Sequence, residues 1–137
     1  MISRGIRNNN PFNLKLSKQK WIGKVPNEQN TDGTFEQFSA MCYGLRAGIM
    51  TLRNYQRKYG IYELKYFIMR FAPPKENQTA KYIDFVLKHM SSRLCINLSR
   101  NYRVEYGSFS FYLMCQAILK YESNYNVSIV DLKSVKL

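Results

Sequence analysis

The sequence has little of the chemistry on which most catalytic sites depend. It contains one histidine, His89, and three widely separated cysteines, Cys42, Cys95 and Cys115. A single imidazole excludes multi-histidine metal sites, and the cysteine spacing excludes a CxxC redox motif or a zinc knuckle. We therefore expect no metal and no organic cofactor, and we interpret the cysteines as small buried hydrophobic residues. Any catalysis should depend on carboxylates.

Long apolar runs are also missing. No uninterrupted run approaches the roughly 20 residues that span a bilayer, and residues 1–10 lack the apolar core and cleavage site of a secretory signal. We expect a chain made in the cytoplasm without a Sec signal or a transmembrane segment. A length of 137 residues fits one domain, and 45% apolar residues indicate a globular core. We expect a monomer in solution.

Acidic residues are few. Nine aspartates and glutamates stand against 21 lysines and arginines, which gives a formal net charge of +12 spread along the chain. Such a balance favours polyanionic partners: nucleic acid, anionic lipid, or the teichoic acid and carboxylates of a bacterial wall. No nucleic-acid-binding motif is recognisable, so we predict no specific nucleic-acid partner.

The apolar periodicity predicts a mainly α, single compact domain. Residues 1–39 are expected to form an irregular arm with a turn at Asp32-Gly33, and a small β-hairpin is compatible with this region. Residues 40–137 are expected to form a helical body. Its predicted helices cover 40–59, 61–72, a stretch from a cap at Asn77 or Thr79 to about 92, a helix capped by Ser108, and a short final helix.

One glutamate occupies an unexpected position. Phe111, Met114, Cys115, Ile118 and Glu122 share one stripe of the helix that follows Ser108. A carboxylate at the end of an apolar stripe is shielded from water, which favours the protonated form that a general acid needs. The alternative is that the helix frays after Ile118 and leaves Glu122 in water or in an ion pair.

Two stretches carry a family resemblance. The ending Glu-Ser-Asn-Tyr-Asn resembles the segment in which lytic transglycosylases and related muramidases of lysozyme-like fold carry their catalytic glutamate, followed by a serine. Residues 4–86 resemble a family of bacteriophage virion and lysis proteins with a lysozyme-like fold. That family typically reads Arg-Gly-Ile-Arg-Asn-Asn-Asn-Pro-Gly-Asn-Ile, Gly-Ile-Arg-Ala and Trp-Ala-Pro-Pro. In this chain, Phe12, Leu45 and Phe71 replace the glycine, isoleucine and tryptophan of the bacteriophage family.

The resemblance implies a circularly permuted order. The asparagine segment is similar to one that follows the catalytic helix in bacterial wall glucosaminidases, yet almost nothing precedes Arg4. We therefore expect Glu122, at the other end of the sequence, to take the place of the missing glutamate. Chain termini often lie close together, which makes permutation tolerable. Glu122 should then lie in a cleft beside residues 8–10 and within reach of Asp32.

Several further residues are candidates for the site. Asp32 is the leading second carboxylate, with an ordinary turn-forming acid as the alternative, and Glu36 could replace it. The substrate-binding candidates are Asn8, Asn9 and Asn10 for sugar hydroxyl and N-acetyl groups, Arg7 for peptide-stem carboxylates, Tyr82 and Ser123. The alternative for the asparagines is that they bond the backbone of the arm.

The sequence therefore predicts cleavage of peptidoglycan glycan strands, as a muramidase or a lytic transglycosylase, with Glu122 as general acid and base. The expected partners are peptidoglycan and other virion proteins, and the expected place of action is the bacterial cell wall. The rival hypothesis is a non-catalytic virion or effector protein that keeps the lysozyme-like fold and binds glycan or a protein partner.

Overall fold

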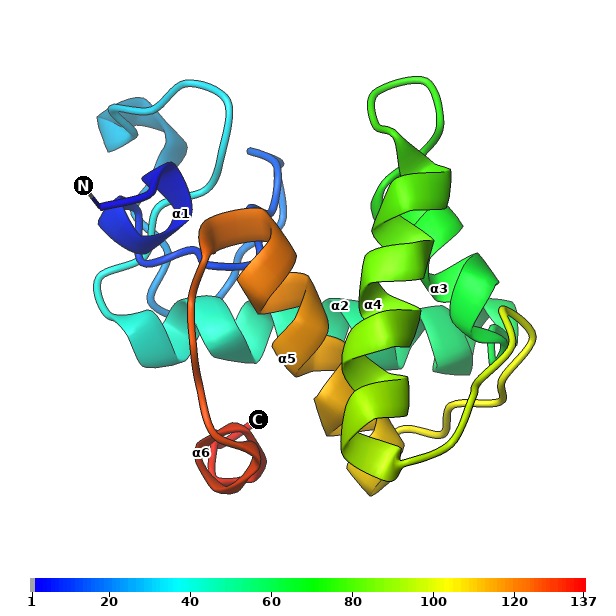
Figure 1. Cartoon of the computed structure of the whole chain (residues 1–137). Coiled ribbons are helices and arrows are strands. Elements are labelled where there is room, and N and C mark those ends of the chain that lie inside the picture. Colours follow the sequence, from blue (N-terminus) through cyan, green and yellow to red (C-terminus); the bar gives the residue numbers. More distant parts are fainter. Residues whose placement is uncertain (1) are drawn as a thin grey trace. The chain divides into compact units, whose positions relative to one another are not determined.

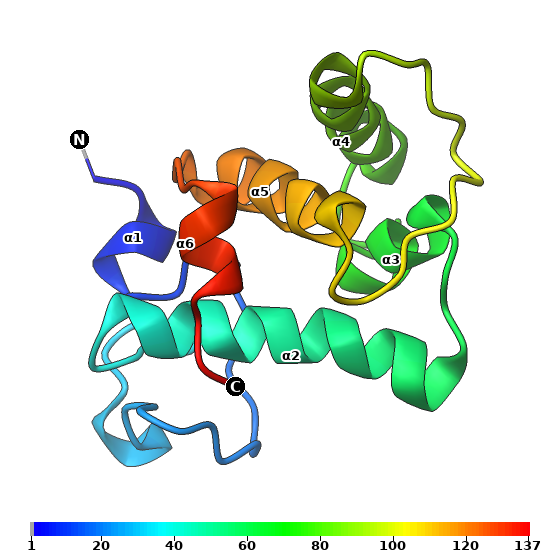
Figure 2. The same cartoon turned by 90° about the horizontal axis from the view of Figure 1, so that it is seen from below.

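The computed structural model describes residues 2–137, and these residues are mainly α-helical, as predicted (Figures 1 and 2). The elements are α1 (Arg4–Arg7), the 3-10 turn η1 (Asn27–Gln29), α2 (Met41–Tyr59), α3 (Leu64–Phe71), α4 (Thr79–Leu94), α5 (Phe109–Ser123) and α6 (Ile129–Lys133). Within residues 2–137 no helix is long and apolar enough to cross a membrane.

The compatible β-hairpin does not form in the described residues. Residues 15 and 24 make only isolated antiparallel bridges to Phe35 and Phe38, and no strand extends from either bridge. Backbone hydrogen bonds still join the segments, for example from Leu16 N to Thr34 O and from Glu36 N to Leu14 O, each 2.9 Å, and side-chain bonds add to them. Asn10 Nδ2, for example, donates to the backbone carbonyls of Leu14 and Glu36.

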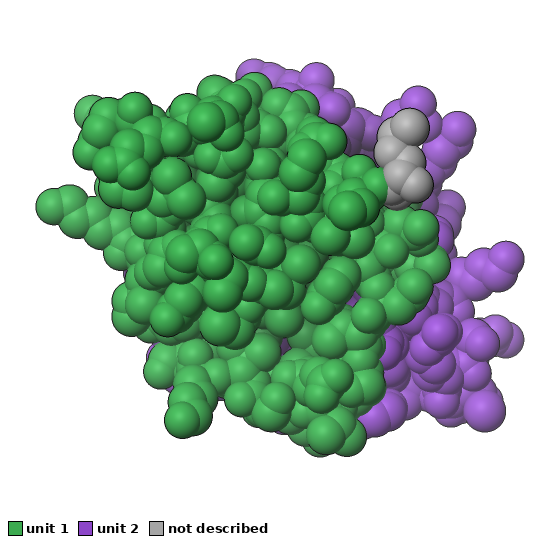
Figure 3. All heavy atoms as spheres, turned by 90° about the vertical axis from the view of Figure 1, so that its left-hand side faces the viewer, with its two compact units in different colours: residues 1–50, 119–137 green, residues 51–118 purple. Residues whose placement is uncertain are grey.

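The chain divides into two compact units. Unit 1 comprises residues 1–50 and 119–137, and unit 2 comprises residues 51–118 (Figure 3). This division differs from the predicted one between an arm, 1–39, and a helical body, 40–137. The arm shares its unit with the first half of α2 and with the C-terminal end of the chain. Helices α2 and α5 each run from one unit into the other.

Serine caps begin the last two helices, and the cap at Ser108 was predicted. Ser108 Oγ accepts the Phe111 N–H at 3.1 Å before α5, and Ser128 Oγ accepts the Asp131 N–H at 3.0 Å before α6. The predicted cap of α4 was wrong. Thr79 Oγ1 instead donates to the Ala72 carbonyl at 2.6 Å, so it ties the start of α4 to the end of α3.

In unit 1 the arm packs closely against α2 at Gly44 and Gly48, two residues that have no side chain. A Cβ on Gly44 would overlap the carbonyl oxygen of Asn9, and one on Gly48 would overlap the ring of Phe12. Phe12 is fully buried as a result. The phenylalanine that replaces glycine in the family pattern therefore fills space that Gly48 leaves open. The arm backbone reaches this position because Asn9 and Asn13 adopt positive φ angles of 53° and 54°, which asparagine tolerates.

Unit 2 is built around α3, α4 and parts of α2 and α5. Its core includes Leu64, Phe67, Val86 and Met90, all fully buried. Gln56 joins α2 to the following loop, because its Nε2 donates to the Val104 carbonyl at 2.8 Å and its Oε1 accepts the Tyr106 N–H at 2.7 Å.

Helix α5 is buried on more than the predicted stripe. Phe111, Met114, Cys115 and Ile118 are fully buried, and Leu113, Ala117 and Leu119 are buried as well. Cys115 therefore behaves as the predicted core residue, and burial raises its pKa above the ordinary range. The same prediction was wrong for Cys42 and Cys95, which are exposed.

Candidate functional site

Glu122 lies in the last turn of a helix that does not fray. Helix α5 continues to Ser123 and ends where Asn124 takes a left-handed conformation, φ 50°. The Glu122 side chain is half-buried. Asn13 Nδ2 donates to Glu122 Oε1 at 3.1 Å and to the Glu122 carbonyl at 3.2 Å. One amide therefore fixes both the carboxylate and the end of the helix that carries it.

Ser123 ties the same end of α5 to the N-terminal arm through two further hydrogen bonds. Its hydroxyl donates to the Pro11 carbonyl at 2.8 Å, and its own carbonyl accepts the Ser3 hydroxyl at 2.7 Å. A Cβ on Gly5 would overlap the Ser123 hydroxyl, so this approach requires glycine. Ser123 is 1% exposed. Its place beside the glutamate was predicted, but the structure gives it a structural role and no surface for substrate.

The three asparagines of the arm hold the arm together. Asn8 donates to Asp32 and accepts from Gln37, and Asn9 donates to the Phe38 carbonyl. Asn8 is 4% exposed and Asn10 is fully buried. Asn9 and Asn10 thus bond the backbone of the arm, as the alternative interpretation predicted, whereas the Asn8 side chain bonds other side chains. A direct contact of Asn10 with glycan would need the arm to open, so we assign Asn10 to the framework of the site.

Asp32 has a structural role in place of the catalytic one expected for it. Its carboxylate accepts two bonds from Arg4, each 2.8 Å, one from Asn8 Nδ2, and the N–H groups of Thr34 and Phe35. The Arg4 guanidinium, helped by these other donors, holds the pKa of Asp32 well below its usual range. A carboxylate with five donors is the turn-forming acid that the sequence allowed as the alternative.

Glu36 is not available as the second carboxylate either. Its side chain is fully buried, and its Oε2 accepts from Lys24 Nζ at 2.9 Å and from the Ser17 hydroxyl at 3.0 Å. Tyr82 is 1% exposed within the core of unit 2, so it offers no ring face to a sugar.

Three of the predicted site residues do line one open pocket. Its volume is about 550 Å³, and its lining is Arg4, Arg7, Asn8, Thr31, Asp32 and Gln37. All six belong to unit 1. The predicted cleft that would hold Glu122 together with Asp32 is not this one, because Glu122 is absent from the lining. In the structure, Glu122 contacts Asn13, whereas Arg7, Asn8 and Asp32 line a separate polar pocket.

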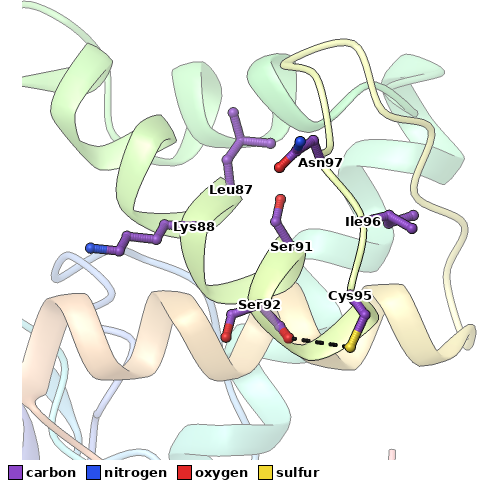
Figure 4. A pocket seen from close by; sticks show the side chains of 7 residues that line it. All are labelled: Leu87, Lys88, Ser91, Ser92, Cys95, Ile96 and Asn97. Carbon is purple, nitrogen blue, oxygen red and sulfur yellow. Dashed lines mark hydrogen bonds between the residues drawn. The ribbon is translucent and has the colours of Figure 1, made fainter.

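Two other hollows contain none of the predicted site residues. One, of about 340 Å³ in unit 1, is lined by Trp21 together with Lys18, Lys20 and Lys24. The other lies at the end of α4 in unit 2, where Cys95 donates a weak hydrogen bond to the Ser92 carbonyl (Figure 4). The lining of the Trp21 pocket also contains Glu28, and its Lys24 is paired with Glu36, so Lys18 and Lys20 are the exposed cations beside Trp21.

The bonds of Asp32 predict a specific pH dependence of stability. Because its native pKa lies below the ordinary value of about 3.9, its contribution to stability is complete above about pH 4 and is lost as the pH falls toward the native pKa. Urea unfolding of the wild type and of Asp32→Asn should therefore give a large difference in free energy of unfolding at pH 6 and a smaller one at pH 3. A difference that stays constant would show that the charge of Asp32 has no part in it.

The chain is similar in sequence to a bacteriophage protein. Over 87 residues the chain is 44% identical to Protein P5 of Pseudoalteromonas phage PM2. A bacteriophage protein is therefore a homologue of this chain. The matched part is 61% of this chain and 53% of the phage protein, so the chain spans about half the length of the curated relative it matches. No family model matches the chain.

Proposed function

We propose that this chain cleaves peptidoglycan glycan strands as a muramidase or lytic transglycosylase, with Glu122 as the general acid and base. The observation that carries the proposal is the contact between Asn13 and Glu122, which are 109 residues apart in the sequence. Asn13 belongs to the arm that resembles the phage lysozyme-like family, in the stretch Asn-Asn-Asn-Pro-Phe-Asn. A permuted order requires that this arm meet the helix end that carries the glutamate.

The geometry at Glu122 suits acid and base catalysis on a bound glycan. Glu122 is half-buried, so part of the residue is open to solvent, while Asn13 restricts the orientation of its carboxylate. Glu122 would protonate the leaving oxygen between N-acetylmuramic acid and N-acetylglucosamine and then accept a proton. Neither Asp32 nor Glu36 is free to act as a second carboxylate. This favours the transglycosylase variant, in which a hydroxyl group of the substrate itself attacks.

The remaining features supply binding. The net charge of +12 would hold the protein on an anionic wall, more weakly as salt rises. The hollow with Trp21 offers an aromatic face for a sugar ring, flanked by exposed Lys18 and Lys20. The homology to a phage protein agrees with a role in a virion or in lysis of the host.

The direct test is release of soluble fragments from purified peptidoglycan by the wild-type protein. The proposal predicts that the protein sediments with the insoluble wall at early times and that soluble sugar appears in the supernatant later. The rival hypothesis of a non-catalytic virion or effector protein predicts sedimentation with the wall and no release. Boiled protein at the same concentration is the control for contaminating release.

A further inference from the structure

The pocket lined by Arg7 has an unusual hydrogen-bonding balance. Its acceptors are already in use. The Asp32 carboxylate takes five donors, Asn8 Oδ1 accepts from Gln37 Nε2 at 3.1 Å, and Gln37 Oε1 accepts the Thr31 N–H at 2.9 Å. Gln37 Nε2 also donates to Thr31 Oγ1 at 2.8 Å. Few hydrogen-bond acceptors in the pocket therefore remain available to a ligand.

Its donors, by contrast, are partly uncommitted. None of the ion pairs among residues 2–137 involves Arg7, whose exposed guanidinium lines the pocket. Thr31 is exposed and uses its hydroxyl oxygen as an acceptor, so its hydroxyl proton remains to be donated. Arg4 is held in place by Asp32 and by the Phe35 ring, 4.7 Å from its guanidinium carbon.

The charge of the pocket follows from these bonds. Arg4 and Asp32 neutralise each other, and Asp32 is the one acid in the lining. Arg7 is left with a full positive charge that nothing in the lining compensates. A pocket that presents an exposed guanidinium fork and a hydroxyl donor, with its acceptors satisfied, suits an oxyanion, since a guanidinium binds a carboxylate with two parallel hydrogen bonds.

We propose that this pocket is a subsite for a free carboxylate of the peptide stem of peptidoglycan, bound by Arg7 with help from Thr31. The proposal rests on the proposed function for the identity of the substrate. It gives the pocket a role separate from Glu122: Glu122 acts on the glycan strand, and the Arg7 pocket selects strands whose peptides carry unmodified carboxylates.

The test measures binding, so it does not depend on cleavage. The ligand is a purified disaccharide–peptide unit with free stem carboxylates, titrated into the protein by calorimetry or by NMR. The comparison ligands are the same unit with amidated stem carboxylates, the disaccharide without peptide, and inorganic phosphate. The variants are Arg7→Gln, Arg7→Lys and, as a control for net charge, Lys58→Gln, an exposed residue of unit 2.

The expected result is about fivefold or greater weakening of Kd by Arg7→Gln, the scale of one exposed charge-assisted pair, and a smaller loss with Arg7→Lys, which keeps the charge without the fork. Amidation of the stem carboxylates should weaken binding to the wild type by the same factor and should not change binding to Arg7→Gln. Lys58→Gln should bind like the wild type.

Three results would overturn the assignment. The first is that Arg7→Gln and Lys58→Gln bind the free-carboxylate ligand equally well. The second is that amidation has no effect on the wild type. The third is that inorganic phosphate binds at Arg7 while the stem carboxylate does not, which would make the pocket a phosphate site. Failure of the proposed function would look different, because walls would stay intact while the carboxylate ligand still bound through Arg7.

Discussion

Glu122→Gln should lower the rate of fragment release from purified peptidoglycan by about a hundredfold to ten-thousandfold, the range that a general acid contributes. Glutamine keeps the side-chain oxygen that accepts from Asn13 Nδ2, so the helix end and the fold should persist. It has no proton of suitable acidity to give to the leaving oxygen. The rate is measured as soluble sugar released per minute, with the thermal unfolding midpoint of each protein recorded beside it.

The matched control for this variant is Asp84→Asn. Asp84 is an exposed acid of unit 2 that pairs with Arg100, so its replacement removes the same charge at a site with no role in the account. We expect it to release fragments at the wild-type rate. If Glu122→Gln is folded and also works at the wild-type rate, Glu122 is not the catalytic acid. If both variants lose activity equally, the loss reflects net charge alone.

Lys24→Met should lower the free energy of unfolding by about 3 to 5 kcal/mol, because it leaves a buried carboxylate without its counter-ion. The Lys24 side chain is 8% exposed and that of Glu36 is fully buried. Lys24 Nζ also donates to the carbonyls of Ser17 and Gln19, at 2.8 and 2.9 Å. The Lys24 ammonium group thus links residues 17, 19 and 36 of the segment that carries Asp32. The measurement is urea unfolding near pH 7.

Two controls separate the buried pair from general effects. Lys20→Met changes a neighbouring exposed lysine and should alter the free energy of unfolding by less than about 0.5 kcal/mol. The double variant Lys24→Met with Glu36→Met removes both charges and should recover much of the lost stability. Equal effects of Lys24→Met and Lys20→Met would show that the ion pair does not stabilise the arm.

The helices could be predicted from the sequence because their signals are local. Apolar spacing, Pro73-Pro74 and the cap at Ser108 act within a few residues, and α2, α3 and α5 appear where these signals place them. The arm could not be predicted in the same way. Its form depends on side-chain bonds between distant residues, such as Lys24 to Glu36, and on the bare face that Gly44 and Gly48 leave on α2.

The candidate site shows the same division. Spacing singled out Glu122, and the structure keeps it in a half-buried helix end. Asn13, which binds it, was overlooked, although it stands in the same motif as residues 8–10; no local rule says which asparagine of such a stretch faces the glutamate. Asp32 was assigned a catalytic role because an acid that precedes a glycine gives the same sequence pattern whether it is catalytic or turn-forming. Its five donors become visible only in three dimensions.

We propose that this protein breaks the bond between N-acetylmuramic acid and N-acetylglucosamine. Mass spectrometry of the soluble products from purified peptidoglycan tests it most directly. We expect the wild type to give fragments that end in reducing or anhydro muramic acid, and Glu122→Gln to give none. Anhydro ends would identify a transglycosylase. Fragments that end in reducing glucosamine, or no soluble fragments from the folded wild-type protein, would contradict it.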